Sequence, residues 1–305
     1  MNSVSHPSFQ VLLYYRYVSI PNPEEYVTRH RAYCEELGLR GRILISAEGI
    51  NGTVSGPTAA TETYMATLLA DPVTAEIEFK IDQADDHVFP KLSVKLRPEI
   101  VTLGLPGEAD IDPNELSGAR LSPSEFHATM QEENVVVIDG RNDYEADLGH
   151  FKSALCPPIR NFREFPDWLK ANEDRIRGRK ILTYCTGGIR CEKLSGYLRR
   201  EGFDQVYQLD GGIVKYGKDP EVRGRDFEGL CYVFDERVGV EVNHTGTRRI
   251  ISHCRHCGTE EPRYGNCRLP SCNEQIFVCP ACRESHGLFC GKSCRASFDT
   301  EVALS

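Results

Sequence analysis

The sequence predicts an α/β protein with an additional α+β domain and a cysteine-rich, metal-binding segment, and three observations lead to this fold class. Residues 9 to about 100 alternate strand-like and helix-like stretches in the order β-α-β-β-α-β, which is typical of a ferredoxin-like sandwich. Residues 121–228 contain continuous apolar runs of the kind found in parallel strands that are covered on both faces. Eight of the 13 cysteines lie between Cys254 and Cys294. The predicted boundaries are 1–102 for the first domain, 103–120 for a linker, 121–228 for the second domain and 229–305 for the cysteine-rich region.

The elements of the first domain follow from residue spacing and from cap and turn signals. Residues 9–18 are rich in aromatic and β-branched side chains, which favour a strand. A helix over 23–37 is predicted from Asn22 as its cap, Pro23 in its first turn and Gly38 as its stop. The remaining elements are strands over 40–47 and 50–56 around a tight turn at 48–52, a helix over 59–69 and a strand over 77–81.

A further strand, KLSVKLRPEIV, carries basic side chains on one face. Lys91, Lys95 and Arg97 stand at alternating positions, so they point to the same side of the strand. They form either an ordinary solvated edge or a surface for a polyanion. Residues 1–100 contain nine Lys and Arg against thirteen Asp and Glu, so any basic patch there must be local.

The second domain follows a linker that is rich in glycine, proline and acidic residues. Ser122 is a helix cap, and Val135 to Ile138 form a continuous apolar run typical of a buried parallel strand. Asp139 and Arg141 follow directly, at the strand end where open α/β sheets bind ligands. On this evidence alone, the pair is more simply explained as a structural ion pair that supports the site.

The chain is organised around a cysteine between a short apolar strand and a helix. Cys185 heads a glycine-containing loop, in which successive N–H groups and the positive end of the following helix would surround its sulfur. Such surroundings stabilise a thiolate, the reactive form of cysteine. The alternative is a buried structural cysteine before a glycine turn. The rest of the predicted active-site loop is Thr186, Gly187, Gly188, Ile189 and Arg190.

Several residues near this loop allow more than one interpretation. Cys191 is either a resolving thiol for an oxidised Cys185 or a small buried helix residue. His150 is either a general base or, more simply, a structural link between a strand and a helix. The helix-start residues Glu192 and Lys193 are expected to face solvent. Candidates for contacts with RNA phosphate are Lys193 and the arginines Arg160, Arg163 and Arg190, and for Arg163 a surface ion pair explains the residue equally well.

Paired cysteines near the C-terminus predict metal sites. Two residues between thiolates allow both to bind one ion, and four pairs suit two tetrahedral four-thiolate sites, for which zinc is favoured. An iron–sulfur cluster is the alternative, and His253, His256 or His286 could replace a thiolate. The pairs are Cys254 with Cys257, Cys267 with Cys272, Cys279 with Cys282, and Cys290 with Cys294.

Composition limits the functional classes. Hydrophobic residues make up 40% of the 305 residues and charged residues 27%, as in soluble globular proteins. No apolar run approaches the roughly 20 residues needed to cross a bilayer, and the N-terminus lacks secretory-signal features. We therefore expect a cytoplasmic protein without membrane contacts. The net charge of −9 argues against a uniformly basic nucleic-acid binder.

The second domain resembles the rhodanese family. The matching features are Asp139, Arg141, Glu145, the Gly149–His150 pair and Ala154, followed by Cys185 at the head of its loop and by the strand-rich stretch VYQLDGGIVKY. The resemblance implies a doubly wound α/β domain whose loop cysteine carries a thiolate or a persulfide. The six-residue loop is as long as in rhodanese sulfurtransferases, whereas related phosphatases have one residue more.

Over nearly its whole length the chain resembles the bacterial rhodanese-type tRNA uridine hydroxylases. The segments that carry this resemblance are EGINGTVSG, GHFKSAL, FREFPDW, YCTGGIRCEK and FDERVG, together with the terminal cysteine cluster. The resemblance implies oxygen-dependent conversion of the wobble uridine of tRNA to 5-hydroxyuridine, with Cys185 as the essential cysteine and the anticodon loop as the partner. It leaves the electron donor unknown, since the chain has no flavin, haem or iron motif.

Two functions remain open at this stage. In the hydroxylase, the Cys185 thiolate would attack uracil C6 and make C5 electron-rich, and other wobble-uridine-modifying enzymes would act on the product. In a sulfurtransferase, a Cys185 persulfide would carry sulfane sulfur, and the flanking modules would be docking surfaces. The loop chemistry alone does not separate the two functions, and the whole-chain resemblance favours the hydroxylase.

Overall fold

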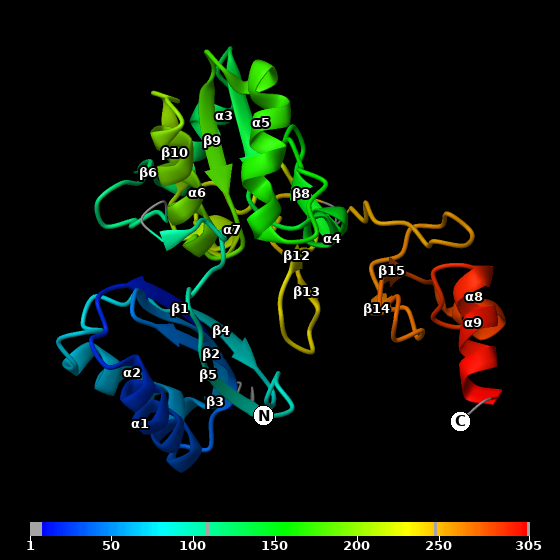
Figure 1. The fold of residues 1–305 in the computed structure, drawn as a ribbon, viewed down its shortest axis with the longest axis horizontal. Coiled ribbons are helices and arrows are strands. Elements are labelled where there is room, and N and C mark those ends of the chain that lie inside the picture. Colours follow the sequence, from blue (N-terminus) through cyan, green and yellow to red (C-terminus); the bar gives the residue numbers. More distant parts are fainter. Residues whose placement is uncertain (1–7, 108–109, 247–248, 304–305) are drawn as a thin grey trace, which may run out of the picture.

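The computed structural model describes residues 8–107, 110–246 and 249–303. Residues 1–7 of the predicted first domain, 108–109 of the predicted linker, and 247–248 and 304–305 of the predicted cysteine-rich region lie outside the described residues. Figure 1 shows three bodies, namely a blue N-terminal sheet with its helices, a green central sheet with its helices, and an orange and red C-terminal segment.

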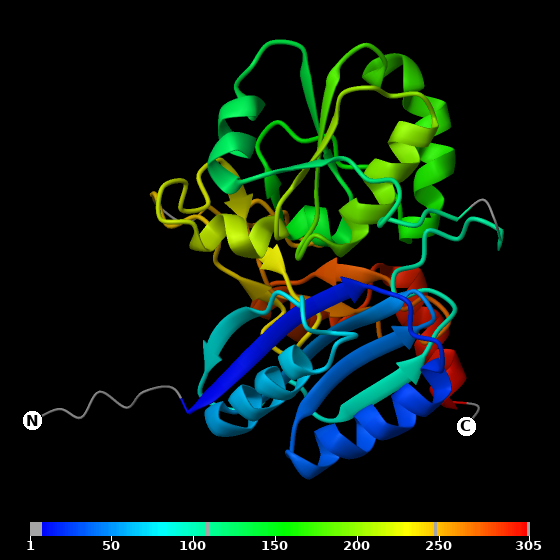
Figure 2. The same cartoon turned by 90° about the vertical axis from the view of Figure 1, so that its left-hand side faces the viewer.

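The N-terminal domain is a five-stranded sheet with two helices on one face. Its sheet order is β4-β1-β3-β2-β5, which adds β5 in parallel to the edge of a ferredoxin-like arrangement. Both helices lie on the face away from the central domain, so the opposite face of the sheet looks toward it (Figure 2). The predicted ferredoxin-like sandwich is confirmed. The elements are β1 (Phe9–Tyr17), α1 (Pro23–Glu36), β2 (Arg40–Ser46), β3 (Gly49–Pro57), α2 (Thr58–Ala70), β4 (Lys80–Ala84) and β5 (Leu92–Leu96).

Three details of this domain differ from the predictions. The tight turn contains only Ala47 and Glu48, because β3 already begins at Gly49 and includes the residues expected in the turn. The fourth strand begins at Lys80 rather than at residue 77, since Ile77 is buried in the core from an irregular stretch after α2. Asn22 is the N-cap residue of α1, as predicted, but its side chain makes no capping hydrogen bond.

The central domain is built on a parallel sheet of order β6-β10-β9-β7 with helices on both faces. Successive residues of β7 alternate between two cores. Val136 and Ile138 pack with side chains of α5 and α6, whereas Val137 packs with those of α3 and α7. This alternation confirms the predicted doubly wound sheet. The elements are β6 (Ala119–Leu121), α3 (Pro123–Met130), β7 (Val135–Asp139), α4 (Asp143–Leu148), β8 (Gly149–Phe151), the 3₁₀ turn η2 (Phe162–Glu164), α5 (Phe165–Ile176), β9 (Lys180–Tyr184), α6 (Ile189–Arg200), β10 (Val206–Leu209), α7 (Gly212–Lys218) and β11 (Phe227–Gly229).

Two stretches of the central region differ from expectation. Leu103 and Ile111, within the predicted linker, are buried in the core formed by α5 and α6, and β6 begins inside the linker at Ala119. This stretch therefore packs against the central domain. The supposedly strand-rich residues 206–216 contain only the short strand β10, after which the chain turns at Gly211 and forms α7.

The C-terminal region has little regular structure. Its strands are only two or three residues long. The apolar clusters around the cysteine pairs consist largely of cysteines with a few aliphatic or aromatic side chains. In Figure 1 the hairpin of β12 and β13 descends beside the N-terminal sheet, and α8 and α9 lie far from it along the long axis. No helix among the described residues is long and apolar enough to cross a membrane. The elements are β12 (Cys231–Tyr232), β13 (Gly239–Val240), β14 (Tyr264–Asn266), β15 (Gln275–Phe277), α8 (Pro280–His286) and α9 (Lys292–Ala303).

Candidate active site and metal centres

The loop between β9 and α6 curls around the sulfur of Cys185. Gly188 is the N-cap of α6 and has a φ of +104°, a conformation that favours glycine. Its backbone N–H donates to Cys185 Sγ at 3.1 Å. The backbone N–H groups of Arg190 and Cys191 also lie near this sulfur and lower the pKa of the thiol. The start of α6 thus surrounds Cys185 with donors, as predicted for a loop at a helix N-terminus.

The turn before α7 supports the loop from the other side. The N–H of Ile213 donates to the carbonyl oxygen of Cys185 at 3.0 Å, and the N–H of Val214 donates to that of Thr186 at 3.1 Å. Gly212 has a φ of +67°, and a Cβ there would lie 2.6 Å from the Cys185 carbonyl oxygen. Only glycine fits this approach, so the Gly-Gly-Ile turn holds the active-site loop in place.

These surroundings make Cys185 an acidic thiol although its side chain is fully buried. Burial raises the pKa of this thiol, but the hydrogen bond from Cys191, the charge of Arg190 and the backbone N–H groups outweigh burial and lower the pKa to about 6. Burial and the neighbouring Cys185 sulfur raise the pKa of the Cys191 thiol, which therefore keeps its proton. Cys185 is then a thiolate at neutral pH, with Cys191 as a donor to it.

Arg190 is bound inside the domain. Its Nη1 donates to Glu145 Oε2 at 2.6 Å and its Nη2 to Glu145 Oε1 at 2.9 Å, a bidentate ion pair with both side chains buried. The structure therefore does not bring Arg190 to the surface, where a phosphate contact was expected. Its charge acts on the Cys185 sulfur instead.

A cavity of about 340 Å³ separates the active-site loop from the open face of the N-terminal sheet. This volume lies at the lower end of the roughly 300–1,000 Å³ typical of small-ligand sites. The loop side is lined by all of the predicted loop residues except Gly188. The sheet side is lined mainly by Leu13 and Tyr15 of β1, Arg42 and Leu44 of β2, Asn51 and Thr53 of β3, and Arg97, Ile100, Val101 and Thr102 beyond β5, while Phe89 and Phe234 add two aromatic rings.

The environment of Lys193 differs from the prediction. It was expected at the surface, yet its side chain is fully buried, because this face of α6 packs against the N-terminal domain. Its Nζ lies 2.8 Å from Glu48, 2.9 Å from Glu99 and 2.8 Å from Asp110. The cation is therefore matched by three carboxylates and is not available to an RNA phosphate.

Glu192 is also buried, contrary to expectation. Its carboxylate accepts hydrogen bonds from the Tyr15 hydroxyl at 2.9 Å, from Arg120 at 2.7 Å and from Gln208 at 3.0 Å. Tyr15 belongs to β1 of the N-terminal domain. Adjacent residues of α6 thus join the two domains beside Cys185.

The basic face of the N-terminal domain remains open. Lys91, Lys95 and Arg97 are exposed along the edge strand β5, and Arg42 is exposed on the neighbouring strand β2. Within residues 8–107, 110–246 and 249–303, none of the four forms an ion pair with a carboxylate. Arg42 and Arg97 both line the Cys185 cavity. These cations are free to meet phosphate groups next to the cavity.

The two other predicted arginines lie elsewhere. Arg160 is half exposed and forms ion pairs with Asp143 at 3.1 Å and, more weakly, with Glu274 at 3.7 Å. It lines a separate cavity between the central domain and the cysteine-rich region. Arg163 is exposed on the turn η2 and does not line the Cys185 cavity.

Asp139 and Arg141 form a closed structural unit. Both are fully buried, and Arg141 donates to Asp139 Oδ1 at 2.9 Å and to Oδ2 at 2.6 Å. Arg141 also donates to the Gly149 carbonyl oxygen, and the Tyr184 hydroxyl donates to Asp139 at 2.7 Å. The pair thereby ties the end of β9 to the end of β7. His150 Nδ1 bonds to the Ala146 carbonyl oxygen, which agrees with a structural role.

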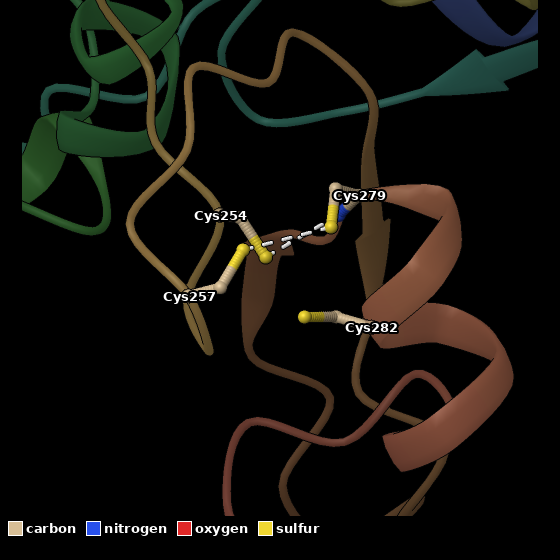
Figure 3. A group of neighbouring side chains, drawn as sticks. All are labelled: Cys254, Cys257, Cys279 and Cys282. Atoms are coloured by element: carbon tan, nitrogen blue, oxygen red, sulfur yellow. Dashed lines mark hydrogen bonds between the residues drawn. The ribbon is translucent and has the colours of Figure 1, made fainter.

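The eight clustered cysteines form two groups, each of which could hold one metal ion. Within each group the four sulfur atoms lie within 4.8 Å of one another. The four cysteine pairs alternate between the two groups along the chain: the first and third pairs form one group, and the second and fourth pairs form the other. Figure 3 shows Cys254 and Cys257 from one loop facing Cys279 and Cys282 at the start of α8. The second group consists of Cys267, Cys272, Cys290 and Cys294.

The sulfur distances suit a single tetrahedral ion. Sulfur atoms about 2.3 Å from a zinc ion at tetrahedral corners lie about 3.8 Å apart. The distance is 3.7 Å between Cys257 and Cys279 and 3.6 Å between Cys272 and Cys290. All of these cysteines are free thiols, too far apart for disulfides. Among the described residues, no histidine belongs to either group.

Sequence reasoning missed several residues of the site. Glu145 was noted only as part of a motif, and its pairing with Arg190 needs the fold of α4 against α6. Arg42 and Phe234 reach the cavity from β2 and from the hairpin after the central domain. No local pattern marks them, although an aromatic residue in the quoted segment FDERVG was a weak signal.

Family models cover most of the chain in three parts. Residues 9–100 match the model described as UPF0176 acylphosphatase like domain. Residues 122–219 match the model of the rhodanese-like domain, and residues 228–295 match the model described as rhodanase C-terminal.

Curated relatives match nearly the whole chain. The chain is 51% identical over 287 residues to the tRNA uridine(34) hydroxylase of Bacillus licheniformis, covering 94% of this chain and 88% of that protein. It is 52% identical to the protein of that name from Bacillus velezensis, over 95% of this chain and 89% of that protein. It is 53% identical to the protein of that name from Bacillus cytotoxicus, over 94% of this chain and 88% of that protein. The chain therefore belongs to the tRNA uridine(34) hydroxylase family.

Proposed function

We propose that this protein hydroxylates uridine 34 of tRNA at carbon 5, with Cys185 as the reactive group. The observation that carries the proposal is the acidic thiol of Cys185 in a cavity whose wall also contains Arg42 and Arg97, two cations without a carboxylate partner among the described residues. A thiolate suits attack on an electron-poor pyrimidine, and the cations suit the phosphates of the RNA that carries it. The relatives carry the name of this activity.

The proposed chemistry begins with a bond between Cys185 Sγ and C6 of the uracil ring. The electrons of the C5–C6 double bond move toward C5 and O4, which makes C5 nucleophilic. Molecular oxygen supplies the hydroxyl oxygen at C5, and two electrons and two protons from a donor outside the chain reduce the second oxygen atom to water. Loss of the C5 proton then expels the Cys185 thiolate and leaves 5-hydroxyuridine. The low thiol pKa suits both the attack and the departure of the sulfur.

The anticodon loop would lie along the basic face of the N-terminal sheet. Lys91, Lys95 and Arg97 follow the exposed edge strand, and Arg42 continues this surface into the cavity. The target base must leave its stack to reach a sulfur at the bottom of a cavity, as other base-modifying enzymes require. The product, made in the cytoplasm, would give other wobble-uridine-modifying enzymes a hydroxyl group on which to act.

We further propose that each cysteine group holds one zinc ion with a structural role. Four thiolates at near-tetrahedral spacing are a zinc ligand set. An iron–sulfur cluster places iron and sulfide between its cysteines and holds them further apart than a single ion does. The ions would supply the stability that the small apolar clusters around residues 254–298 lack.

Nucleoside analysis of cellular tRNA tests the function. A strain that lacks the protein is complemented with the wild type or with Cys185→Ser, and its tRNA nucleosides are measured by mass spectrometry. We expect 5-hydroxyuridine and its derivatives to return only with the wild type. Their presence without the protein, or with Cys185→Ser, would contradict the proposal and would call for an assay of sulfur transfer from thiosulfate to cyanide.

A chemical trap tests the covalent step. An anticodon stem-loop with 5-fluorouridine at position 34 should form an adduct with Cys185, because fluorine at C5 cannot leave as the C5 proton does. The adduct is found by peptide mass spectrometry, and the Cys185→Ser variant is the control. Absence of the adduct in a protein that binds the RNA would exclude attack at C6.

A further inference from the structure

An exposed aromatic ring stands at the rim of the Cys185 cavity. Phe234 lies in the loop between β12 and β13 and is 45% exposed. Among the described residues it is the aromatic member of a set of four exposed large hydrophobic side chains. It lines the cavity together with Cys185 and the loop that follows it. The ring is therefore accessible to a ligand that enters the cavity.

The loop that carries Phe234 is held firmly in place. The N–H of Val233 donates to the Val238 carbonyl oxygen at 2.8 Å and closes the loop. The N–H of Glu236 donates to the Val88 carbonyl oxygen at 3.0 Å, which anchors the loop tip to the N-terminal domain. Arg237 forms a further ion pair, at 3.0 Å, with Asp82 of β4. The backbone of Phe234 is thereby positioned before any ligand arrives.

The ring itself is partly oriented by a neighbour. Phe234 and Tyr232 meet in an edge arrangement, with ring centroids 5.1 Å apart and an interplanar angle of 76°. Because the ring is only partly covered, much of its surface stays free for a flat ligand. A rigid aromatic side chain loses little conformational freedom on binding, which makes it an efficient stacking partner.

The chemistry of the cavity indicates a nucleobase with a phosphate backbone. Arg42 and Arg97 supply positive charge without carboxylate partners among the described residues. Thr186 also lines the cavity. Its buried hydroxyl lies near the Cys231 thiol and makes no hydrogen bond of good geometry with a described residue. The polar edge of a nucleobase could form a hydrogen bond with this hydroxyl, and the flat face of the same base could stack on an aromatic side chain.

We propose that Phe234 stacks on the pyrimidine that enters the Cys185 cavity and holds it out of the anticodon stack. This inference rests on the proposed function, because it takes single-stranded RNA as the ligand. Phe234 is then a substrate-binding residue contributed by the segment after the central domain. It explains why the hairpin of β12 and β13 reaches across to the N-terminal sheet.

Photochemical cross-linking tests the stacking directly. An anticodon stem-loop with 5-iodouridine at position 34 is irradiated in complex with the full-length protein, and the modified peptide is identified by mass spectrometry. Iodouracil couples efficiently to a stacked aromatic ring, so we expect the cross-link at Phe234. A cross-link at Tyr15 or Phe89 in its place would overturn the proposal.

Binding measurements supply the second readout. Phe234→Ala should raise the Kd of the unmodified stem-loop roughly 5- to 150-fold, the range that loss of one base–aromatic stack produces. Phe234→Trp should stay within a few-fold of the wild type. Leu69→Ala is the matched control, since Leu69 is 47% exposed on α2, on the other face of the sheet. Equal Kd values for the wild type and Phe234→Ala would overturn the proposal.

The two proposals fail in distinguishable ways. Cross-linking and binding need no oxygen or electron donor, so they do not depend on the hydroxylation chemistry. If the wild type restores 5-hydroxyuridine in cells and Phe234→Ala restores it equally at limiting expression, only the stacking is wrong. If the stem-loop binds and cross-links at Phe234 while cellular nucleosides stay unchanged, the function is wrong and the RNA site remains.

Discussion

Cys185 differs from Cys34, Cys156 and Cys231, which lie outside both its loop and the two metal groups, in what surrounds its sulfur. Burial raises the pKa of Cys34, Cys156 and Cys231 to about 12 each, since few groups nearby favour their thiolates. At Cys185 the same penalty is outweighed by the Cys191 thiol, the Arg190 charge and the N–H groups at the start of α6. The reactive cysteine is therefore defined by its loop and not by its exposure.

The pH dependence of alkylation checks this difference. A lowered pKa means that the reactive thiolate of Cys185 is present above about pH 6 and is lost as the pH falls through that value. We expect the rate of carbamidomethylation of Cys185 by iodoacetamide, followed by peptide mass spectrometry, to rise with a midpoint near pH 6. Cys191→Ala removes a donor and should move the midpoint upward. The Cys34 peptide is the internal control, and a wild-type midpoint near the ordinary value of about 8.5 would contradict the expectation.

The Arg190–Glu145 pair should matter for stability because it is buried. Removing one partner leaves a buried charge without compensation, so Glu145→Gln should lower the free energy of unfolding of the central domain by about 3–5 kcal/mol. The single tryptophan, Trp168, packs in this domain and reports its urea unfolding by fluorescence.

A matched variant separates burial from charge. Glu173→Gln breaks an exposed ion pair with Arg177 on α5, and such pairs contribute about 0–1 kcal/mol. If Glu145→Gln and Glu173→Gln lowered the free energy of unfolding by similar amounts, the Arg190–Glu145 pair would have no special role in holding the loop.

At the scale of elements, the strand β5 should supply the electrostatic part of RNA binding. Each cation that contacts a phosphate contributes about 0.7 to 0.9 to the slope of log K against log salt concentration. The double variant Lys95→Gln with Arg97→Gln should therefore lower this slope by about 1.4 to 1.8 for an anticodon stem-loop. Lys170→Gln, an exposed lysine on α5, is the control. An unchanged slope would place the RNA on another surface.

The cysteine-rich segment should depend on its ions for folding. We expect two zinc ions per chain by elemental mass spectrometry, and one in Cys254→Ser or in Cys272→Ser. Each variant should lose amide-exchange protection around its own group first. Cys156→Ser, outside both groups, should keep two ions. Iron and sulfide in the wild type would exclude the zinc assignment.

Elements and motifs were predictable because their signals are local. The apolar run of β7 and the glycine turn after Cys185 each lie within a few residues. Two of the three carboxylate partners of Lys193 lie 83 and 94 residues away in the sequence, and the third, Glu48, lies further still. The position of Lys193 at a helix start resembles that of any surface lysine. The cysteine pairs were visible from spacing, whereas their interleaving depends on the path of the chain between them. The cavity could not be predicted, since it exists only between two domains.

For the whole molecule, the attachment of the N-terminal domain to α6 is what makes the site. Glu48 and Glu99 of that domain and Asp110 of the following segment converge on Lys193. One residue earlier, the Glu192 carboxylate accepts a hydrogen bond from the Tyr15 hydroxyl of β1. These contacts lie next to the Cys185 loop, so they set the distance between the sulfur and the opposite wall of the cavity. A domain that moved freely would leave Cys185 open to water.

Replacing Lys193 tests this dependence. Lys193→Met keeps much of the side-chain volume but leaves three carboxylates without their cation, at a buried site where this loss is strongly destabilising. We expect the N-terminal domain to loosen from the central domain, with faster proteolysis within residues 103–118 and a larger radius of gyration in solution. Because both walls of the cavity are then no longer held together, hydroxylation in cells should fall even though Cys185 is intact.

The control for Lys193→Met is Lys95, an exposed lysine of the N-terminal domain that takes no part in joining the two domains. Lys95→Met removes an exposed cation without a carboxylate partner among the described residues, so it should weaken RNA binding while leaving proteolysis unchanged. The two lysines thus separate two contributions to one activity, the joining of the domains and the attraction of the RNA. Equal proteolysis of wild type and Lys193→Met would mean that apolar contacts alone fix the domains, such as those of Leu13 and Tyr15 against the glycines of the active-site loop. The cavity would then persist without the buried ion cluster.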